Sequence, residues 1–129
     1  MTLRQIATST AAAPTASYSQ AMVAGGLVAT GGQVGRDPVT GELGSDFAAE
    51  VRLALANLLA VLAAAGTDAS HVFKTNCFIT DIANFAEFDR IYQEFFSEPY
   101  PARSTVGIAL AGGLGFEVEA WAVLPGDAS

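Results

Sequence analysis

Residues 101–124 read PARSTVGIALAGGLGFEVEAWAVL, two largely apolar runs on either side of a glycine-rich segment. Because side chains alternate between the two faces of a strand, this stretch predicts a hairpin of two strands with a turn at residues 111–114. The second strand has one fully apolar face, formed by Phe116, Val118, Ala120, Ala122 and Leu124. On the first strand, the same alternation predicts a core face of Ser104, Val106, Ile108 and Leu110. One side of the hairpin is therefore expected to pack in the core.

The opposite face of this hairpin gathers polar groups: Arg103 and Thr105 on the first strand, and Glu117, Glu119 and Trp121 on the second. An arginine suits two-point binding of a carboxylate, and a nearby carboxylate could orient a water molecule. With the turn at its predicted place, Arg103 and Glu117 would lie at opposite ends of the hairpin, about 14 Å apart. The pattern fits two arrangements: an exposed ion pair between the strands, or two groups on either side of a cavity. The distance between Arg103 and Glu117 favours the cavity.

The length and the apolar content of the chain limit the number of domains and the size of the core. A chain of 129 residues predicts a single domain over residues 1–129 that can bury a substantial core. Hydrophobic residues make up 51% of the chain, and the mean hydropathy of +0.38 is high for so small a domain. Surplus apolar surface on a small domain is often used for association between copies. The composition therefore indicates a homo-oligomer.

Charge and residue usage narrow the class of partner. The net charge is −7, from six basic and thirteen acidic residues without a basic cluster, which argues against nucleic-acid binding. Cys77 is the single cysteine, and we expect it to be a small core residue rather than a nucleophile. With His71 as the single histidine, no zinc site is expected. No apolar run approaches about 18 residues and no leader is evident, so we predict a cytoplasmic protein without a membrane partner.

The first half of the chain carries local signals for a hairpin and a helix. Two apolar tetrads flank Gly25-Gly26, which predicts a hairpin with the glycines at its turn. A helix is expected to start at a cap formed by Ser45 or Asp46 and to end at Ala65, before a glycine. Residues 1–17 are small and polar, and they predict either an irregular arm or a short strand followed by a loop.

The second half predicts one more strand and one more helix. Residues 72–79 form the strand, and its more apolar side is expected to contain Phe73, Thr75, Cys77 and Ile79. Asn84 and Glu87 resemble a capping box, and the helix after them has one apolar face, formed by Phe88, Ile91, Tyr92 and Phe95. The resulting order is typical of the α+β class, a mixed sheet with two helices packed on one face. The other face of the sheet, expected to carry Arg103 and Glu117, is left for partners or solvent.

Several short motifs resemble the RidA/YjgF family, also called Rid or "L-PSP endoribonuclease". The family signature is similar to PARSTV at residues 101–106 followed by FEVEA at residues 116–120. Further matches occur at YSQ (18–20), TGGQ (30–33), DPVTGE (37–42), KT (74–75) and YQEFF (92–96). The resemblance extends, in order, over nearly the whole chain.

This resemblance implies a chorismate-mutase-like fold that assembles as a homotrimer with clefts between subunits. It also implies an enzyme, a deaminase that hydrolyses reactive 2-imino or enamine acids, such as 2-iminopropanoate and 2-iminobutanoate, to 2-oxo acids and ammonia. The expected partners are therefore a small 2-imino acid substrate and its 2-oxo acid product. No cofactor or metal is expected, because an imine carbon is already electrophilic and needs little more than a clamp and a positioned water.

The family's site residues correspond to specific positions of this chain. The resemblance implies that Arg103 holds the substrate carboxylate, that Tyr18 closes the pocket and that Glu117 helps to place the attacking water. It also implies that Gly32 offers its backbone to the ligand. Thr105 stands where many members have a cysteine, and its hydroxyl can still bond a water molecule.

Further pocket positions depart from the family pattern or complete it. Gly31 stands where a serine is common and Asp89 where an asparagine is frequent, and both are expected to bind substrate together with Phe85. Residues 110–113 replace a Leu-Pro pair. The departures leave the arginine clamp in place and the substrate open. Three alternatives remain. One is a non-catalytic trimer that senses small carboxylates, and another is an endoribonuclease, against which the acidic charge and the single histidine argue. The third is a purely structural interaction protein, against which the polar face of residues 101–124 argues.

Overall fold

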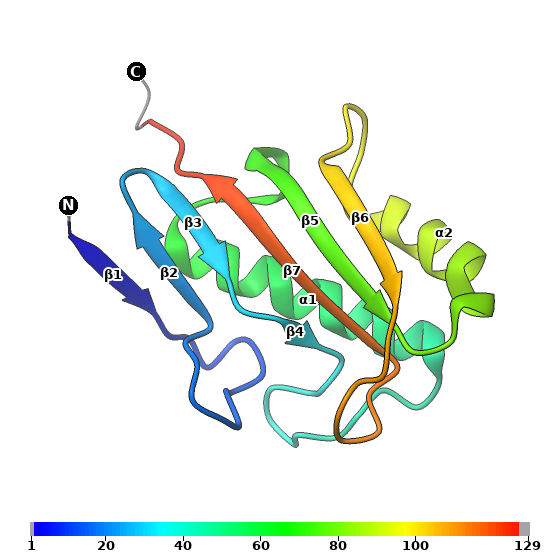
Figure 1. Ribbon diagram of the computed structural model, residues 1–129. Helices are drawn as coiled ribbons and strands as arrows, with labels where there is room; N and C mark the ends of the chain where they lie inside the picture. Colours follow the sequence, from blue (N-terminus) through cyan, green and yellow to red (C-terminus); the bar gives the residue numbers. More distant parts are fainter. Residues whose placement is uncertain (1, 127–129) are drawn as a thin grey trace.

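The computed structural model describes residues 2–126 as a sheet covered by helices on one face (Figure 1). The strands and α-helices are β1 (Leu3–Ile6), β2 (Ala21–Ala24), β3 (Leu27–Thr30), β4 (Gln33–Val34), α1 (Phe47–Ala65), β5 (Val72–Ile79), α2 (Phe85–Phe95), β6 (Ala102–Gly107) and β7 (Phe116–Val123). The sheet has the order β1-β2-β3-β7-β5-β6, and β4 pairs with β7. Among the strands of residues 2–126, only β5 and β6 pair in parallel, so the predicted mixed sheet with two helices on one face is confirmed.

The N-terminal part of the sheet follows the local sequence signals. β2 and β3 form the predicted antiparallel hairpin, with Ala24 paired to Leu27. Gly25 and Gly26 have φ angles of 55° and 82°, a left-handed conformation that a tight turn of this kind requires and that glycine adopts without strain. β1 pairs with β2, so the N-terminal segment is a short strand followed by a loop.

The predicted hairpin of residues 101–124 is wrong. β6 and β7 do not pair with each other, because β5 lies between them, parallel to β6 and antiparallel to β7 (Figure 1). The chain leaves β6 at Gly107 and passes around the end of β5, where Ile108 donates its N–H to the Ile79 carbonyl at 2.9 Å. It then returns as β7, and the Thr80 N–H donates to the Gly115 carbonyl at 3.2 Å. β6 and β7, which follow one another in the sequence, are thus separated in the sheet by β5.

α1 is the main helix of the core and begins and ends as predicted. The Asp46 carboxylate accepts the Ala49 N–H at 2.8 Å, and Gly66 ends the helix with a φ angle of 94°. By length and composition α1 could cross a membrane, since a window of 18 residues has a hydropathy of 1.7. Glu50, Arg52 and Asn57 interrupt this stretch, so it is not a continuous apolar run. In the fold α1 covers the sheet, and its buried side chains include Val51, Leu55, Leu58, Val61 and Leu62.

α2 and β5 differ in detail from their sequence patterns. Asn84 makes no side-chain capping bond; a 3₁₀ turn over Ile82–Asn84 precedes α2, and Asp81 caps that turn by accepting the Ala83 N–H. The predicted face of α2 is confirmed for Phe88, Ile91 and Tyr92, which are buried, and Phe95 packs against the core. In β5, Thr75, Cys77 and Ile79 are buried as predicted, but Phe73 is 46% exposed. An irregularity between Val72 and Lys74 interrupts the alternation there.

The two faces of the sheet differ in what covers them. The helix-covered face carries buried side chains of β3, β5 and β7, among them Val28, Cys77, Val118, Ala120 and Ala122. The opposite face, which we call the open face, has no helix over it in residues 2–126 (Figure 1). Register places apolar side chains there, Leu27, Phe78, Val106, Trp121 and Val123, beside polar ones that include Lys74, Asn76, Ser104, Glu117 and Glu119.

Candidate functional site

Arg103 projects from β6 toward α2 and lies among three aromatic rings. Its guanidinium carbon is 4.7 Å from the centre of the Tyr92 ring, 5.0 Å from that of Phe88 and 5.6 Å from that of Phe85. Such rings attract a cation through their electron-rich faces and restrict where the planar guanidinium can lie. The side chain is 21% exposed. The fold therefore holds this cation in place while leaving part of it accessible.

Asp89, in α2, forms an ion pair with Arg103. Arg103 Nη1 donates to Asp89 Oδ1 at 2.8 Å, and Gln93 Nε2 donates to Asp89 Oδ2 at 3.3 Å. Within the described part of the chain, Asp89 is the only hydrogen-bond acceptor of the Arg103 guanidinium, so its other N–H groups remain available to a ligand.

A cavity of about 340 Å³ lies at this ion pair, and we call it the arginine pocket. It is lined by Asp89, Tyr92, Gln93, Tyr100, Pro101 and Arg103.

Thr105 follows Arg103 on the same face of β6. Its hydroxyl is buried and has no hydrogen-bond partner within residues 2–126. A buried hydroxyl without a partner is costly, which makes Thr105 a position where a water or ligand atom would be stabilised. Its register partner Cys77 is fully buried, and burial raises the pKa of that thiol to about 12. Cys77 is thus a core residue, as predicted, and not a nucleophile.

Glu117 lines a second cavity, on β7, which β5 separates from β6. This cavity, the glutamate pocket, has a volume of about 430 Å³, and its lining includes Tyr18, Gly31, Gly32, Arg36, Leu114 and Glu117. Burial raises the pKa of Glu117 above its ordinary value, and the neighbouring Glu119 carboxylate raises it further. Glu119 accepts a bond from Asn76 Nδ2 at 3.1 Å, whereas Glu117 accepts none from the residues described. Of the two carboxylates, Glu117 is therefore the one free to bind a water molecule.

Gly31 and Gly32 let the chain approach closely at the glutamate pocket. A Cβ atom at Gly32 would overlap Oε2 of Glu117. A Cβ atom at Gly31 would lie 2.9 Å from the Ser19 carbonyl oxygen and 3.4 Å from Cδ1 of Tyr18. Tyr18 itself is 45% exposed at the rim of the cavity. The absence of side chains at both glycines thus brings Tyr18 and Glu117 to one cavity.

The predicted common face of Arg103 and Glu117 is wrong. In register with β5, Arg103 pairs with Thr75 and Glu117 pairs with Phe78. Thr75 and Phe78 are an odd number of residues apart, so they point to opposite faces of the sheet. Arg103 lies on the helix-covered face and Glu117 on the open face. The expected core face of the first strand is wrong for the same reason, since Val106 is 43% exposed.

The predicted site residues therefore form two separate groups in the chain. Arg103, Asp89, Phe85 and Thr105 lie together near α2. Tyr18, Gly31, Gly32 and Glu117 lie together at the glutamate pocket. Register across β5 separates the two groups by face as well as by position along the sheet.

Glu50 supports the glutamate pocket and was missed by the sequence analysis. Its carboxylate is buried at the start of α1, and Oε2 accepts the N–H groups of Gly115 at 2.7 Å and of Phe116 at 3.1 Å. These are the residues immediately before Glu117, so Glu50 fixes the start of β7. The available signal was a carboxylate directly beside Val51 on the apolar stripe of α1. Such a group must find donors when it is buried.

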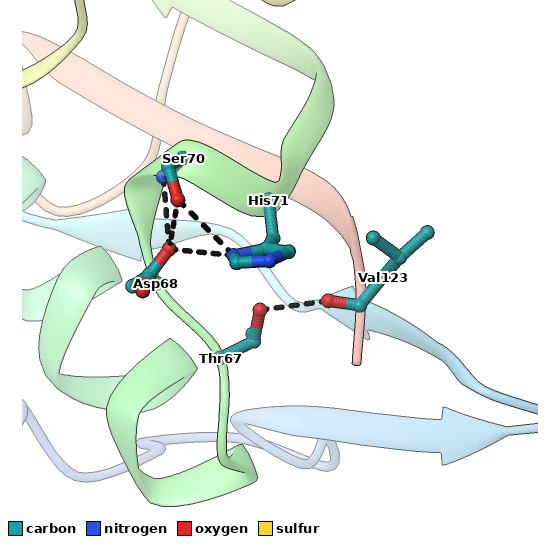
Figure 2. Close-up of polar contacts among 5 residues, drawn as sticks. All are labelled: Thr67, Asp68, Ser70, His71 and Val123. Carbon is teal, nitrogen blue, oxygen red and sulfur yellow. Dashed lines mark hydrogen bonds and ion pairs between the residues drawn. The ribbon is translucent and has the colours of Figure 1, made fainter. Parts of the chain in front are cut away.

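A cluster of Asp68, Ser70 and His71 superficially resembles a catalytic triad (Figure 2). Asp68 Oδ1 lies 2.6 Å from Ser70 Oγ and 2.8 Å from His71 Nδ1, and Ser70 Oγ lies 3.1 Å from that same nitrogen. In a hydrolytic triad the serine and the aspartate contact different imidazole nitrogens. Here Asp68 caps the 3₁₀ turn over Ala69–His71. The cluster is therefore a capping arrangement at the start of β5.

Metal binding has no visible site in the structure. Among residues 2–126, no three His, Cys, Asp or Glu side chains lie together in a way that could hold a metal ion.

Comparisons with known proteins agree with the fold and with the motifs. The sequence model of the family described as Endoribonuclease L-PSP matches residues 8–124. A RutC family protein from Sinorhizobium fredii is 42% identical over 120 residues, covering 92% of this chain and 95% of that protein. The 2-iminobutanoate/2-iminopropanoate deaminase of Escherichia coli is 38% identical over 124 residues, covering 93% and 97%.

Solved structures give the same result. RidA from an Antarctic Psychrobacter species superposes with a TM-score of 0.92 at 37% identity, over 94% of this chain and 99% of that chain. Escherichia coli TdcF, solved with bound serine, gives a TM-score of 0.89 at 37% identity, over 93% and 98%. The motif at residues 101–120, the sheet with its two helices and these matches agree. The chain therefore belongs to the Endoribonuclease L-PSP family, which includes RidA, as its sequence motifs predicted.

Proposed function

We propose that this protein hydrolyses 2-imino acids and their enamine tautomers to 2-oxo acids and ammonia. The observation that carries the proposal is Arg103, a partly exposed guanidinium held among three rings with N–H donors left free beside a cavity. A fixed guanidinium is suited to binding the carboxylate that every such substrate contains. The similarity to relatives named as 2-iminobutanoate/2-iminopropanoate deaminases supports the same reaction.

The proposed active site combines residues of two copies of the chain. A small 2-imino acid cannot contact Arg103 and Glu117 of one protomer, since they lie on opposite faces of the sheet. We therefore propose a homotrimer in which the arginine pocket of one copy meets the glutamate pocket of the next. The apolar side chains on the open face, with Leu27 46% and Val106 43% exposed, favour such an association.

In the proposed reaction, Arg103 binds the substrate carboxylate and Tyr18 of the neighbouring copy closes over it. Glu117 orients a water molecule and accepts its proton as the water oxygen adds to C2. Burial and the Glu119 carboxylate raise the pKa of Glu117, which favours a carboxyl that takes up the proton and returns it to nitrogen. The C–N bond then breaks, so that one water is consumed and one ammonia is released with the 2-oxo acid. The Thr105 hydroxyl is available to bond a water molecule during these steps.

Imine hydrolysis in solution tests the proposal. An amino-acid oxidase or a serine/threonine dehydratase generates the imino acid in place, and release of the 2-oxo acid is followed over time. We expect the wild type to accelerate release and Arg103→Ala to lose the acceleration while keeping its oligomeric state. Arg4→Ala, which removes an exposed arginine on β1, is the matched control and should retain full activity. Full activity in a correctly assembled Arg103→Ala protein would refute the proposal.

A carboxylate-binding protein without turnover is the second candidate. Thr105 favours it, because this residue stands where many members of the family have a cysteine, and its buried hydroxyl has no hydrogen-bond partner within residues 2–126. Binding of small carboxylates that depends on Arg103, together with no acceleration of imine hydrolysis, would establish this alternative. RNA cleavage is the remaining activity suggested by the family's description; cleavage lost in Glu117→Ala would support it. In either case we propose a cytoplasmic location, consistent with a single buried thiol.

A further inference from the structure

The arginine pocket contains a negative charge as well as a positive one. Asp89 and Arg103 both line the same cavity, and their charged atoms lie 2.8 Å apart. The Asp89 side chain is 36% exposed and that of Arg103 is 21% exposed, so both charges can be reached by a ligand. Among the described residues, Asp89 accepts from Arg103 at Oδ1 and from the neutral amide of Gln93 at Oδ2, so only Oδ1 is paired with a charge.

This pairing changes which ligands the pocket should accept. Arg103 alone would present one positive charge and would bind any small carboxylate. With Asp89 beside it the local charge is zero, and a plain carboxylate brings a second negative charge next to Asp89. Charges this close, and only partly exposed, interact more strongly than charges in bulk water. A ligand that carries a cationic nitrogen near its carboxylate avoids this repulsion, because the nitrogen can face Asp89.

We propose that Asp89 makes the arginine pocket selective for zwitterions, 2-iminium acids and 2-amino acids, over plain carboxylates of the same size. In such a ligand the carboxylate binds the free N–H groups of Arg103, and the protonated nitrogen donates to Asp89. The nitrogen is two bonds from the carboxylate carbon, so one ligand can reach both members of the ion pair. This inference rests on the proposed function and specifies the substrate form that it uses.

The selectivity has a consequence for turnover. The iminium substrate carries a positive nitrogen, whereas the 2-oxo acid product carries only a carboxylate. Asp89 therefore favours the substrate over the product at the same clamp. Release of the product is assisted by the repulsion that its carboxylate meets beside Asp89.

A purely structural role for Asp89 makes a different prediction. In that case Asp89 would hold the Arg103 side chain in its rotamer, and its removal would weaken all carboxylates alike. The ratio of affinities for two ligands that differ only in the charged nitrogen separates the two roles. L-alanine and L-lactate form such a pair, since an ammonium group in one is a hydroxyl group in the other.

The experiment measures dissociation constants of L-alanine and L-lactate by calorimetric titration of the intact oligomer. We expect the wild type to bind L-alanine about tenfold or more tightly than L-lactate. In Asp89→Asn, which keeps the shape of the side chain, this preference should fall by about tenfold or more, mainly through tighter binding of lactate. Asp46→Asn removes the same charge at the cap of α1, away from the pocket, and should leave the ratio unchanged.

Each outcome decides the proposal. A ratio that changes by less than about tenfold in Asp89→Asn overturns it, and so does failure of the wild type and Asp89→Asn to bind either ligand. Equal binding of alanine and lactate by the wild type overturns it independently of any variant. Imine hydrolysis is measured separately. If Asp89→Asn shifts the ratio of affinities but the wild type does not hydrolyse imines, the proposed function is refuted and the selectivity is supported. If the wild type hydrolyses imines but the ratio is unshifted, the selectivity is refuted and the proposed function is supported.

Discussion

The hydroxyl groups of Thr75 and Tyr92 lie 2.9 Å apart in the core and join β5 to α2 beside Arg103. Thr75 is the register partner of Arg103, and the Tyr92 ring lies 4.7 Å from the guanidinium. Burial raises the pKa of Tyr92 to about 12, so its hydroxyl stays protonated at neutral pH. This bond therefore supports one wall of the arginine pocket.

Tyr92→Phe is expected to lower the free energy of unfolding by about 1–3 kcal/mol, because it leaves the buried Thr75 hydroxyl without a partner. The ring beside Arg103 remains, so ligand binding should change little. Urea unfolding measures the loss. Thr75→Val removes the other hydroxyl, and the double variant should lose less stability than the sum of the two single changes. Strict additivity would show that the bond contributes nothing.

Glu117→Gln is expected to abolish imine hydrolysis and to stabilise the protein at pH 7. Burial and, second, the Glu119 carboxylate raise the pKa of Glu117 in the folded state. A raised pKa means that the favourable contribution of this group is present below its unfolded value near 4.5 and is lost as the pH rises through the folded value.

The gain from Glu117→Gln should therefore appear at pH 7, should stay below about 1 kcal/mol because the group is partly exposed, and should fade toward pH 4. Urea unfolding at the two pH values measures it. Glu119→Gln serves as a control, since it removes only the second cause and should stabilise less. A loss of stability in Glu117→Gln at pH 7 would contradict this account.

Gly32→Ala is expected to destabilise the protein by about 1–3 kcal/mol and to displace Glu117, because the added Cβ overlaps the carboxylate. Thermal unfolding and the rate of imine hydrolysis measure the two effects. In a protein that already carries Glu117→Ala, the same change should cost much less, since the overlapping atoms are gone. An equal cost in both backgrounds would mean that Gly32 is required for another reason.

Glu50→Ala is expected to lower the free energy of unfolding by about 1–3 kcal/mol, because the N–H groups of Gly115 and Phe116 lose their acceptor. Glu50→Gln keeps an acceptor oxygen and should lose less. Amide hydrogen exchange at these two residues gives a local measurement that urea unfolding cannot. Unchanged protection of both amides in Glu50→Ala would refute this role.

The elements set by neighbouring residues could be predicted from the sequence. Asp46 and the glycine after Ala65 bound α1 through capping bonds made within one turn. Gly25-Gly26 sets the β2–β3 turn through its own backbone angles. Phe73 was assigned to the wrong face because an irregularity in β5 shifts the alternation of side chains, and no residue type in the strand indicates that irregularity.

The pairing of β6 and β7 could not be predicted, because the strand between them comes from residues 72–79. The alternation of side chains shows which residues of one strand share a face. It shows which faces of two strands lie on the same side of the sheet only when the two strands pair directly. Arg103 and Glu117 were therefore placed on one face, although the alternation along each strand is as predicted. The ion pair of Arg103 with Asp89 was missed for a similar reason, since it forms across two elements that the sequence does not orient.

The division of the candidate site into two groups allows two inactive variants to complement each other. If each site combines the arginine pocket of one copy with the glutamate pocket of the next, chains with Arg103→Ala and chains with Glu117→Ala are defective in different halves. Trimers assembled from an equal mixture would then contain intact sites, about a quarter of the total by random assortment. Two inactive proteins, refolded together, should complement each other and recover activity that neither has alone.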